Sequence, residues 1–300
     1  MTGMKVKCGF GPGFRAAQPD PSAFAHLVDV LEELRFDSLW LSERVTGGWL
    51  DPLSALAFAA GRTRRLKLGT STLVVPGRNP VLLARELASI DVLSGGRFLP
   101  AFGLGRADPA EHQAFGVTRR ERGAWFDEAL PLMRRLWRED SVTHAGPRFP
   151  VTDLSIGPKP VGRMEVWIGG RTPGEYDRAG RLAQGWLGSF QTPTEAGQAR
   201  RLIEEACARH GREIDDDHFG MVLPYARTGI DPALEQFLAR ARPEVAATDL
   251  IPHGSDGLKS FVDLYVAQGI TKFVLIPAAP PVSWDDELNW LSPVVREIEA

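Results

Sequence analysis

The 300-residue sequence predicts an α/β protein, a (β/α)8 barrel, from three observations. Short apolar runs recur along the chain. Seven of them are followed, within a few residues, by Asp, Asn or Thr directly before proline, a pair that caps a helix and fills its first position. Between each cap and the next apolar run, the hydrophobic period becomes that of a helix. An eighth unit completes the number that a closed barrel of parallel strands requires.

Each element can be placed in chain order. The expected strands cover residues 6–10, 38–41, 66–75, 98–104, 166–168, 186–190, 221–225 and 272–276. The first seven helices are expected to begin at Asp20-Pro21, Asp51-Pro52, Asn79-Pro80, Asp108-Pro109, Thr172-Pro173, Thr192-Pro193 and Asp231-Pro232. The eighth is expected to begin at Ser283, with Asp286 three residues on, and to run to about Glu299.

The alternative fold is an open doubly wound sheet. Such a sheet usually has about five to seven strands and carries a Gly-x-Gly-x-x-Gly motif near its start. Here Gly9, Gly11 and Gly13 only alternate with other residues. The barrel is therefore favoured.

Two stretches rich in proline and glycine interrupt the alternation, at residues 140–163 and 226–257. The first is interpreted as an inserted loop with room for a short hairpin, and the second as an irregular crossover. Neither is long enough to be a domain, so a single domain over residues 1–300 is expected. In barrels such insertions usually wall the mouth of the active site.

Composition excludes several function classes. Lysine and arginine total 35 against 38 acidic residues, a net charge of −3, which argues against nucleic acid or an anionic membrane as the main partner. Two cysteines are too few for a disulfide framework or a cysteine-based zinc site. The first residues fit neither a signal peptide nor an anchor, and no apolar stretch is long enough for a membrane span. A cytoplasmic protein is expected.

The reactive residues of a barrel lie at the carboxyl ends of its strands. The residues expected there are Phe14, Ser42, Glu43, Arg44, Ser71, Thr72, Arg78, Gly103, Gly105, Arg106, Gly169, Gly170, Thr172, Ser189, Gln191, Tyr225 and Pro277. All six histidines fall elsewhere and this rim has one carboxylate, so a metal-dependent hydrolase or a glycosidase pair is not expected. The rim is therefore expected to bind a reagent rather than to supply the reactive group from its own side chains.

The best candidate for anion binding is the turn after residues 166–168. Gly169 and Gly170 end a strand and Thr172 caps the next helix, so backbone N–H groups and a helix dipole would face a phosphate there. An ordinary strand-to-helix turn explains the same residues equally well. Ser189, one strand on, either adds a hydroxyl or is a solvated turn residue.

Glu43 and Arg44 have two interpretations, a surface ion pair or a pair on the catalytic face. Their place directly after a strand favours the catalytic face, where Glu43 would transfer protons and Arg44 would hold charge. Arg78, Arg106 and Arg171 are either solvated or gathered at the mouth, where they would suit a ligand with several negative charges. Trp49 either packs in the core or covers a bound ring.

Five segments of the sequence resemble those of a known family. They are FDSLWLSE at 36–43, LGTST at 68–72, the run from Asn79-Pro80 to LSGGR at 93–97, Phe115-Gly116 with Arg122-Gly123, and WIGG at 167–170 with Gly185-Trp186. In this order they resemble the bacterial luciferase-like flavin oxidoreductases, and within them the branch that uses the deazaflavin coenzyme F420.

The resemblance implies a TIM barrel, usually a homodimer packed through the helices near strands two to four. A flavin or deazaflavin would lie across the rim, with its phosphate near Gly169-Gly170 and Ser189. The resemblance also implies a non-proline cis peptide at Ser71-Thr72, in a bulge that supports the ring. Ser42, Gly103, Arg106 and Thr172 would complete the cofactor site.

The sequence departs from its relatives at three positions. Relatives that oxidise alcohols or sugar phosphates have a His where this chain has Arg44, and an acidic residue where it has Arg106. An Asp that commonly precedes Gly-Trp is Gln184 here. A dehydrogenase of the sugar-phosphate type is therefore not expected.

The function expected from the sequence is hydride transfer between F420 and a small organic substrate, with Glu43 and Arg44 as catalytic residues. The cofactor would supply most of the chemistry. A reduced-FMN-dependent two-component monooxygenase and a flavin-binding protein without turnover remain as alternatives.

Overall fold

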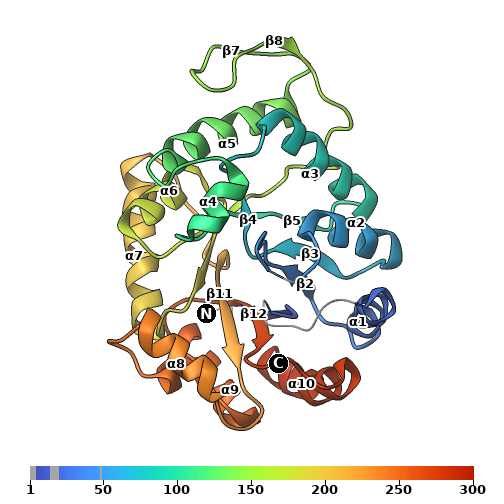
Figure 1. The fold of residues 1–300 in the computed structure, drawn as a ribbon, viewed down its shortest axis with the longest axis vertical. Coiled ribbons are helices and arrows are strands. Elements are labelled where there is room, and N and C mark those ends of the chain that lie inside the picture. The colour runs from blue at the N-terminus through green and yellow to red at the C-terminus, as the bar shows by residue number, and fades with distance from the viewer. Residues whose placement is uncertain (1–4, 14–19, 48) are drawn as a thin grey trace.

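Parallel strands form the centre of the molecule and helices surround them, in a computed structural model that describes residues 5–13, 20–47 and 49–300 (Figure 1). All the expected strands are present. Six are continuous: β1 (Lys7–Phe10), β2 (Ser38–Leu41), β9 (Trp167–Gly169), β10 (Gly185–Ser189), β11 (Phe219–Tyr225) and β12 (Lys272–Pro277). Two are interrupted and give β3 (Lys67–Thr70) with β4 (Leu73–Val74), and β5 (Phe98–Leu99) with β6 (Ala101–Gly103).

The strand order shows that the sheet closes on itself. The order is β4-β6-β9-β10-β11-β12-β1-β2-β3-β5, and the neighbouring strands pair in parallel. The first and last segments in this order, β4 and β5, each belong to one of the two interrupted strands. Because β3 pairs with β5 and β4 pairs with β6, these two strands lie next to each other and close the ring. Ten strand segments therefore occupy eight positions around a barrel, which confirms the predicted fold class.

The predicted helix starts are confirmed at all eight positions. The helices are α1 (Pro21–Glu33), α2 (Pro52–Arg62), α3 (Pro80–Ser94), α4 (Pro109–Phe115), α6 (Pro173–Leu182), α7 (Pro193–Arg209), α8 (Pro232–Ala241) and α10 (Trp284–Ile298). The cap side chains act as expected; the Asp51 carboxylate, for example, accepts a hydrogen bond from the N–H of Ser54 at 2.8 Å.

Two helices begin at positions that are not among the predicted starts, α5 (Arg122–Arg138) and α9 (Gly254–Val266). No Asp-Pro, Asn-Pro or Thr-Pro pair precedes either of them in the sequence, so the signal that marked the others is missing. The stretch 226–257 contains the predicted helix α8 and, in addition, the short 3-10 helix η1 (Ala247–Asp249), which was not predicted.

The first insertion forms a hairpin of β7 (Val142–His144) and β8 (Val151–Leu154), which projects from the barrel beyond α5 (Figure 1). The prediction that it walls the active-site mouth is wrong. The hairpin follows a helix and precedes β9, so it lies at the amino-terminal ends of the strands. The segment 226–257 follows β11 and lies at the carboxyl-terminal end, as expected.

Below the mouth, the barrel interior is filled by a cluster around Trp40 on β2, with Ala101, Trp167, Leu187, Val274 and Ile276. Two glycines make room for the Trp40 indole. A Cβ at Gly9 would lie 2.6 Å from its Nε1, and a Cβ at Gly69 would lie 2.3 Å from its Cε3. The indole N–H donates to Ser38 Oγ at 2.8 Å, so this large side chain is fixed as the floor of the mouth.

The LSGGR run has a structural role. The Arg97 guanidinium is half-buried and donates to the carbonyls of Ala60, Thr63, Leu66 and Ser94. It therefore ties the end of α2 and the start of β3 to the end of α3. Within the described ranges, no helix combines the length and apolar character that crossing a bilayer would need.

Candidate active site

Three of the predicted cofactor residues meet at the break between β3 and β4. The Ser71-Thr72 peptide is cis, as the resemblance implied. The Thr72 side chain packs against two glycines from neighbouring strands: a Cβ at Gly103 would lie 2.4 Å from Thr72 Oγ1, and a Cβ at Gly169 would lie 2.7 Å from Thr72 Cγ2. Thr72, between β3 and β4, thus forms a small-residue cradle with Gly103 and Gly169, which end β6 and β9.

Ser42 connects this cradle to β2. Its hydroxyl donates to the Ser71 carbonyl at 2.7 Å, and its Oγ lies 3.1 Å from Ser71 Oγ. The backbone N–H of Glu43 donates to the Thr72 carbonyl at 3.3 Å. The end of β2 and the cis peptide are therefore held in register.

The Glu43 carboxylate is buried, with 4% of its side chain exposed, and it pairs with Arg78. It also accepts a hydrogen bond from the Val74 N–H at 2.6 Å. Burial raises the pKa of Glu43 above its ordinary value, although Arg78 and the Val74 N–H act in the opposite direction. Neither interpretation made from the sequence anticipated Arg78 as the partner. The expected proton-transfer role of Glu43 stays a prediction.

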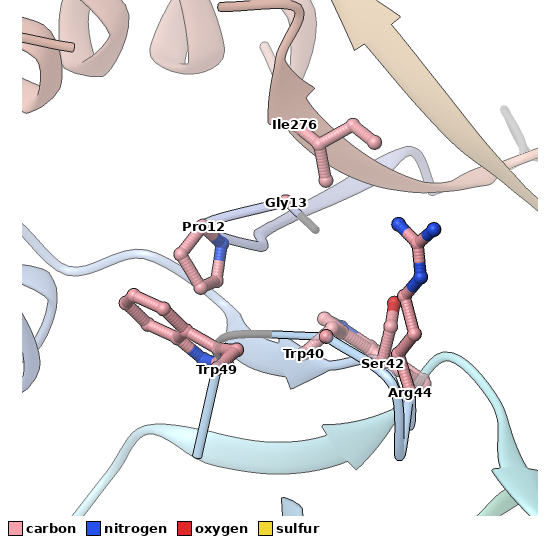
Figure 2. Close-up of a pocket in the computed structure, with 8 residues that line it drawn as sticks. Pro12, Gly13, Trp40, Ser42, Arg44, Trp49 and Ile276 are labelled. Atoms are coloured by element: carbon pink, nitrogen blue, oxygen red, sulfur yellow. The ribbon is translucent and has the colours of Figure 1, made fainter. Parts of the chain in front are cut away.

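Arg44 lines a pocket at the ends of β12, β1 and β2 (Figure 2). Figure 2 shows its guanidinium on one side of the pocket and Trp49 with Pro12 on the other. The described residues that line the pocket are Pro12, Gly13, Trp40, Ser42, Arg44, Gly47, Trp49 and Ile276. Glu43 is not among them. The pocket is therefore apolar over most of its wall and cationic at one side.

Arg106 is exposed in the loop after β6. Burial and the nearby charge of Arg106 lower the pKa of Arg44, while Glu111 and Asp108 raise it by less. The two predicted rim arginines are thus close enough to repel each other. The Arg106 loop is held by the buried Arg122, whose Nη1 donates to the carbonyls of Leu104 and Arg106 at 2.9 Å each.

The predicted phosphate turn requires a correction. The backbone N–H groups of Arg171 and Thr172 donate to Glu175 Oε2 at 2.9 and 3.0 Å, and the Thr172 hydroxyl donates to the same oxygen at 2.8 Å. These donors were expected to face a ligand. Because Glu175 is the third residue of α6, its side chain reaches back in a capping box, and the chain's own carboxylate takes the anion position.

The remaining rim residues divide into two groups. Ser189 ends β10, is half-buried and lies one strand from the Gly169-Gly170 turn. Tyr225 and Gln191 are buried instead: the Tyr225 hydroxyl donates to Glu287 at 2.7 Å, and the Gln191 amide donates to the Tyr176 hydroxyl at 3.0 Å. Phe14 lies outside the described residues.

Sequence reasoning did not include five of the residues that line the pocket: Pro12, Gly13, Trp40, Gly47 and Ile276. A signal for Ile276 was present, because residues alternate between the two faces of a strand and Val274 and Ile276 both face the barrel interior. Trp49 lines the pocket and also packs against the hydrophobic core, so its role in covering a bound ring stays a prediction. Its indole N–H is buried and, as far as the described residues go, has no hydrogen-bond acceptor.

A family model described as luciferase-like monooxygenase matches residues 2–256. The chain belongs to this family. The resemblance seen in the sequence is thereby confirmed, and the luciferase-like protein is an enzyme of the oxidoreductase class.

Two curated relatives illustrate the family. A Mycobacterium tuberculosis protein named as a coenzyme F420-dependent oxidoreductase is 29% identical over 276 residues, 87% of this chain and 72% of that protein. An F420-dependent glucose-6-phosphate dehydrogenase of Kineococcus radiotolerans is 31% identical over 195 residues, 62% of this chain and 57% of its own length. The match thus spans little more than half of the dehydrogenase.

Solved structures share the fold across the whole chain. An F420-dependent secondary alcohol dehydrogenase in complex with an F420-acetone adduct superimposes with a TM-score of 0.82 at 17% identity, covering 98% of this chain and 99% of that one. The oxygenating constituent of 3,6-diketocamphane monooxygenase from Pseudomonas putida, in complex with FMN, gives 0.75 at 16% identity, covering 99% and 96%. At these identities the likeness concerns the fold.

Proposed function

We propose that this luciferase-like protein is an F420-dependent oxidoreductase that transfers a hydride between the deazaflavin and a small organic substrate. The names of the two curated relatives support the cofactor. The observation that carries the proposal is the pairing of the small-residue cradle at Thr72 with the Arg44 pocket on the same rim.

The small-residue cradle is proposed as the support for a flat ring. Gly103 and Gly169 leave the space that the Thr72 side chain fills, because a Cβ at either position would collide with it. The two glycines thereby fix the Thr72 side chain at the rim, where the ring would rest on it. Ser42, Ser71, Arg106, Gly170, Thr172 and Ser189 are proposed as the further cofactor contacts.

When bound, the deazaflavin supplies a carbon that accepts or donates a hydride. The chain's own residues would position the cofactor and substrate, shield them from water and stabilise charge on them. The cradle would orient the ring, and the Trp40 floor excludes water from below. Arg44 would stabilise negative charge on the substrate. Glu43 is the carboxyl proposed for proton transfer; its raised pKa supports that role, and its two hydrogen bonds oppose it.

The phosphate of the cofactor is proposed to bind by the Gly169-Gly170 turn and Ser189. Glu175 holds the amides there, so binding would require its carboxylate to move aside or the phosphate to contact Ser189 and Gly170 instead.

Equilibrium binding of F420 and FMN, each oxidised and reduced, at two salt concentrations tests the cofactor. We expect tight F420 binding that weakens with salt, because the arginines at the mouth suit an acidic tail. Preference for reduced FMN would favour the monooxygenase alternative, for which the FMN-bound neighbour is the supporting observation. Tight binding without any substrate-dependent redox change would favour a binding protein without turnover.

We further propose one domain over residues 1–300 and a homodimer in the cytoplasm. Exposed apolar side chains on α2 and α3, namely Phe58, Leu82, Val92 and Leu93, support a dimer surface near strands two to four. The free, buried thiols of Cys8 and Cys207 suit a reducing compartment. Sedimentation equilibrium of wild type and Leu93→Glu tests the dimer: the variant is expected to be monomeric.

A further inference from the structure

The Arg44 pocket combines two kinds of chemistry within one small space. Trp49 and Pro12 form an apolar wall on one side, and Ile276 closes the pocket from β12 (Figure 2). The Arg44 guanidinium stands across from the aromatic wall, with the Ser42 hydroxyl beneath it. A ligand that satisfies both sides has a flat or apolar body and a group that accepts hydrogen bonds from a cation.

The guanidinium that Arg44 presents across from the aromatic wall favours an anion over a neutral acceptor, because charge-assisted hydrogen bonds are stronger than neutral ones. Arg106 adds a second positive charge, and it lowers the pKa of Arg44 by more than either nearby acid, Glu111 or Asp108, raises it. A ligand carboxylate would relieve the repulsion between the two arginines.

The position of the pocket separates it from the ring cradle. The pocket lies at the ends of β12, β1 and β2, whereas Thr72 lies between β3 and β4 and the two glycines end β6 and β9. The contact between Ser42 and Ser71 joins the two. A ring seated on the cradle would leave the pocket open to a second molecule.

We propose that the substrate is an organic carboxylate, with its apolar body against Trp49 and Pro12 and its carboxylate bound by Arg44, supported by Arg106. The inference rests on the proposed function because it names the substrate class of the same site. In this proposal the anion that binds Arg44 belongs to the substrate. The alternative is that Arg44 binds the acidic tail of the cofactor.

Calorimetric binding of 3-phenylpropanoate and of its amide tests the proposal. The two probes have the same shape and differ in charge. Wild type is expected to bind the carboxylate about tenfold more tightly than the amide, the ratio that one charge-assisted hydrogen bond provides. Arg44→Gln should abolish the preference, Arg44→Lys should retain part of it, and Arg106→Gln should reduce it. Arg201→Gln, an exposed arginine on α7, is the matched control and should change nothing.

The outcomes separate the sources of the anion. F420 affinity within twofold of wild type in Arg44→Gln, together with loss of the carboxylate preference, would support the proposal. Equal binding of carboxylate and amide by wild type would overturn it, as would a parallel loss of F420 affinity in Arg44→Gln. The titrations are run with and without F420, so failure of the protein to bind F420 would reject the proposed function while the comparison of probes still decides the substrate class.

Discussion

The Glu43 carboxylate pairs with the Arg78 guanidinium, 35 residues further along the chain. It also accepts a hydrogen bond from the Val74 N–H in β4, just beyond the cis peptide. This pairing gives Glu43 a structural role next to the cradle. The structural role of Glu43 and its proposed proton-transfer role can be separated by experiment, because Arg78 has only the structural role.

Glu43→Gln and Arg78→Met should both destabilise the fold, by about 1–3 kcal/mol, since each leaves a partly buried charge or polar group without its partner. Thermal unfolding measures this shared loss. Turnover with F420, corrected for the folded fraction, should fall further in Glu43→Gln than in Arg78→Met if the carboxyl transfers protons. Equal corrected turnover in the two variants would reject that role.

The pH dependence of stability offers a second test of Glu43. Its folded pKa is raised above 4.5, chiefly by burial, so the folded state holds the proton more tightly than the unfolded chain. This contribution is fully present below pH 4.5 and is lost as pH rises through the folded pKa. The difference in unfolding free energy between wild type and Glu43→Gln should therefore decrease as pH rises above 4.5. Urea titrations from pH 4 to 7 measure it, and a difference that increases with pH would contradict the burial effect.

Close packing in the cradle makes a paired prediction possible. Gly169→Ala and Gly103→Ala should each cost about 1–3 kcal/mol, because the new Cβ collides with Thr72. The colliding atoms differ: Cγ2 for Gly169 and Oγ1 for Gly103. Thr72→Ser removes only Cγ2, so it should restore stability and F420 affinity to Gly169→Ala but not to Gly103→Ala.

A double-mutant cycle by chemical denaturation measures this selectivity. Rescue of both alanine variants, or of neither, would show that the collisions are relieved by movement of the backbone rather than at Thr72.

Local signals account for what the sequence predicted correctly. A cap and proline lie next to each other in the chain at seven helix starts, and Ser283 lies three residues before Asp286 at the eighth, so all eight starts could be read without knowledge of the fold. The pairing of Arg78 with Glu43 and the position of Trp49 beside Pro12 could not be predicted, because they depend on which strands become neighbours. The hairpin at β7–β8 was placed at the wrong end of the barrel because insertions in barrels usually follow strands, whereas this one follows the helix α5.

The contact of Glu175 with the predicted phosphate turn had a signal that was overlooked. The spacing Thr172-x-x-Glu175 is that of a capping box, which predicts that the glutamate occupies the amides of its own helix start. Gly169 and Gly170 suggested a free anion site only because the third helical residue was not considered.

Glu175 therefore provides the last prediction. Glu175→Gln keeps a side chain that can cap α6 but removes the negative charge from the Arg171 and Thr172 amides. If the cofactor phosphate binds at this turn, F420 affinity should rise several-fold, because the phosphate no longer meets a carboxylate. Glu195→Gln is the matched control, since Glu195 caps α7 through the Thr192 N–H in the same way. Equal F420 affinity in wild type and Glu175→Gln would move the phosphate away from this turn.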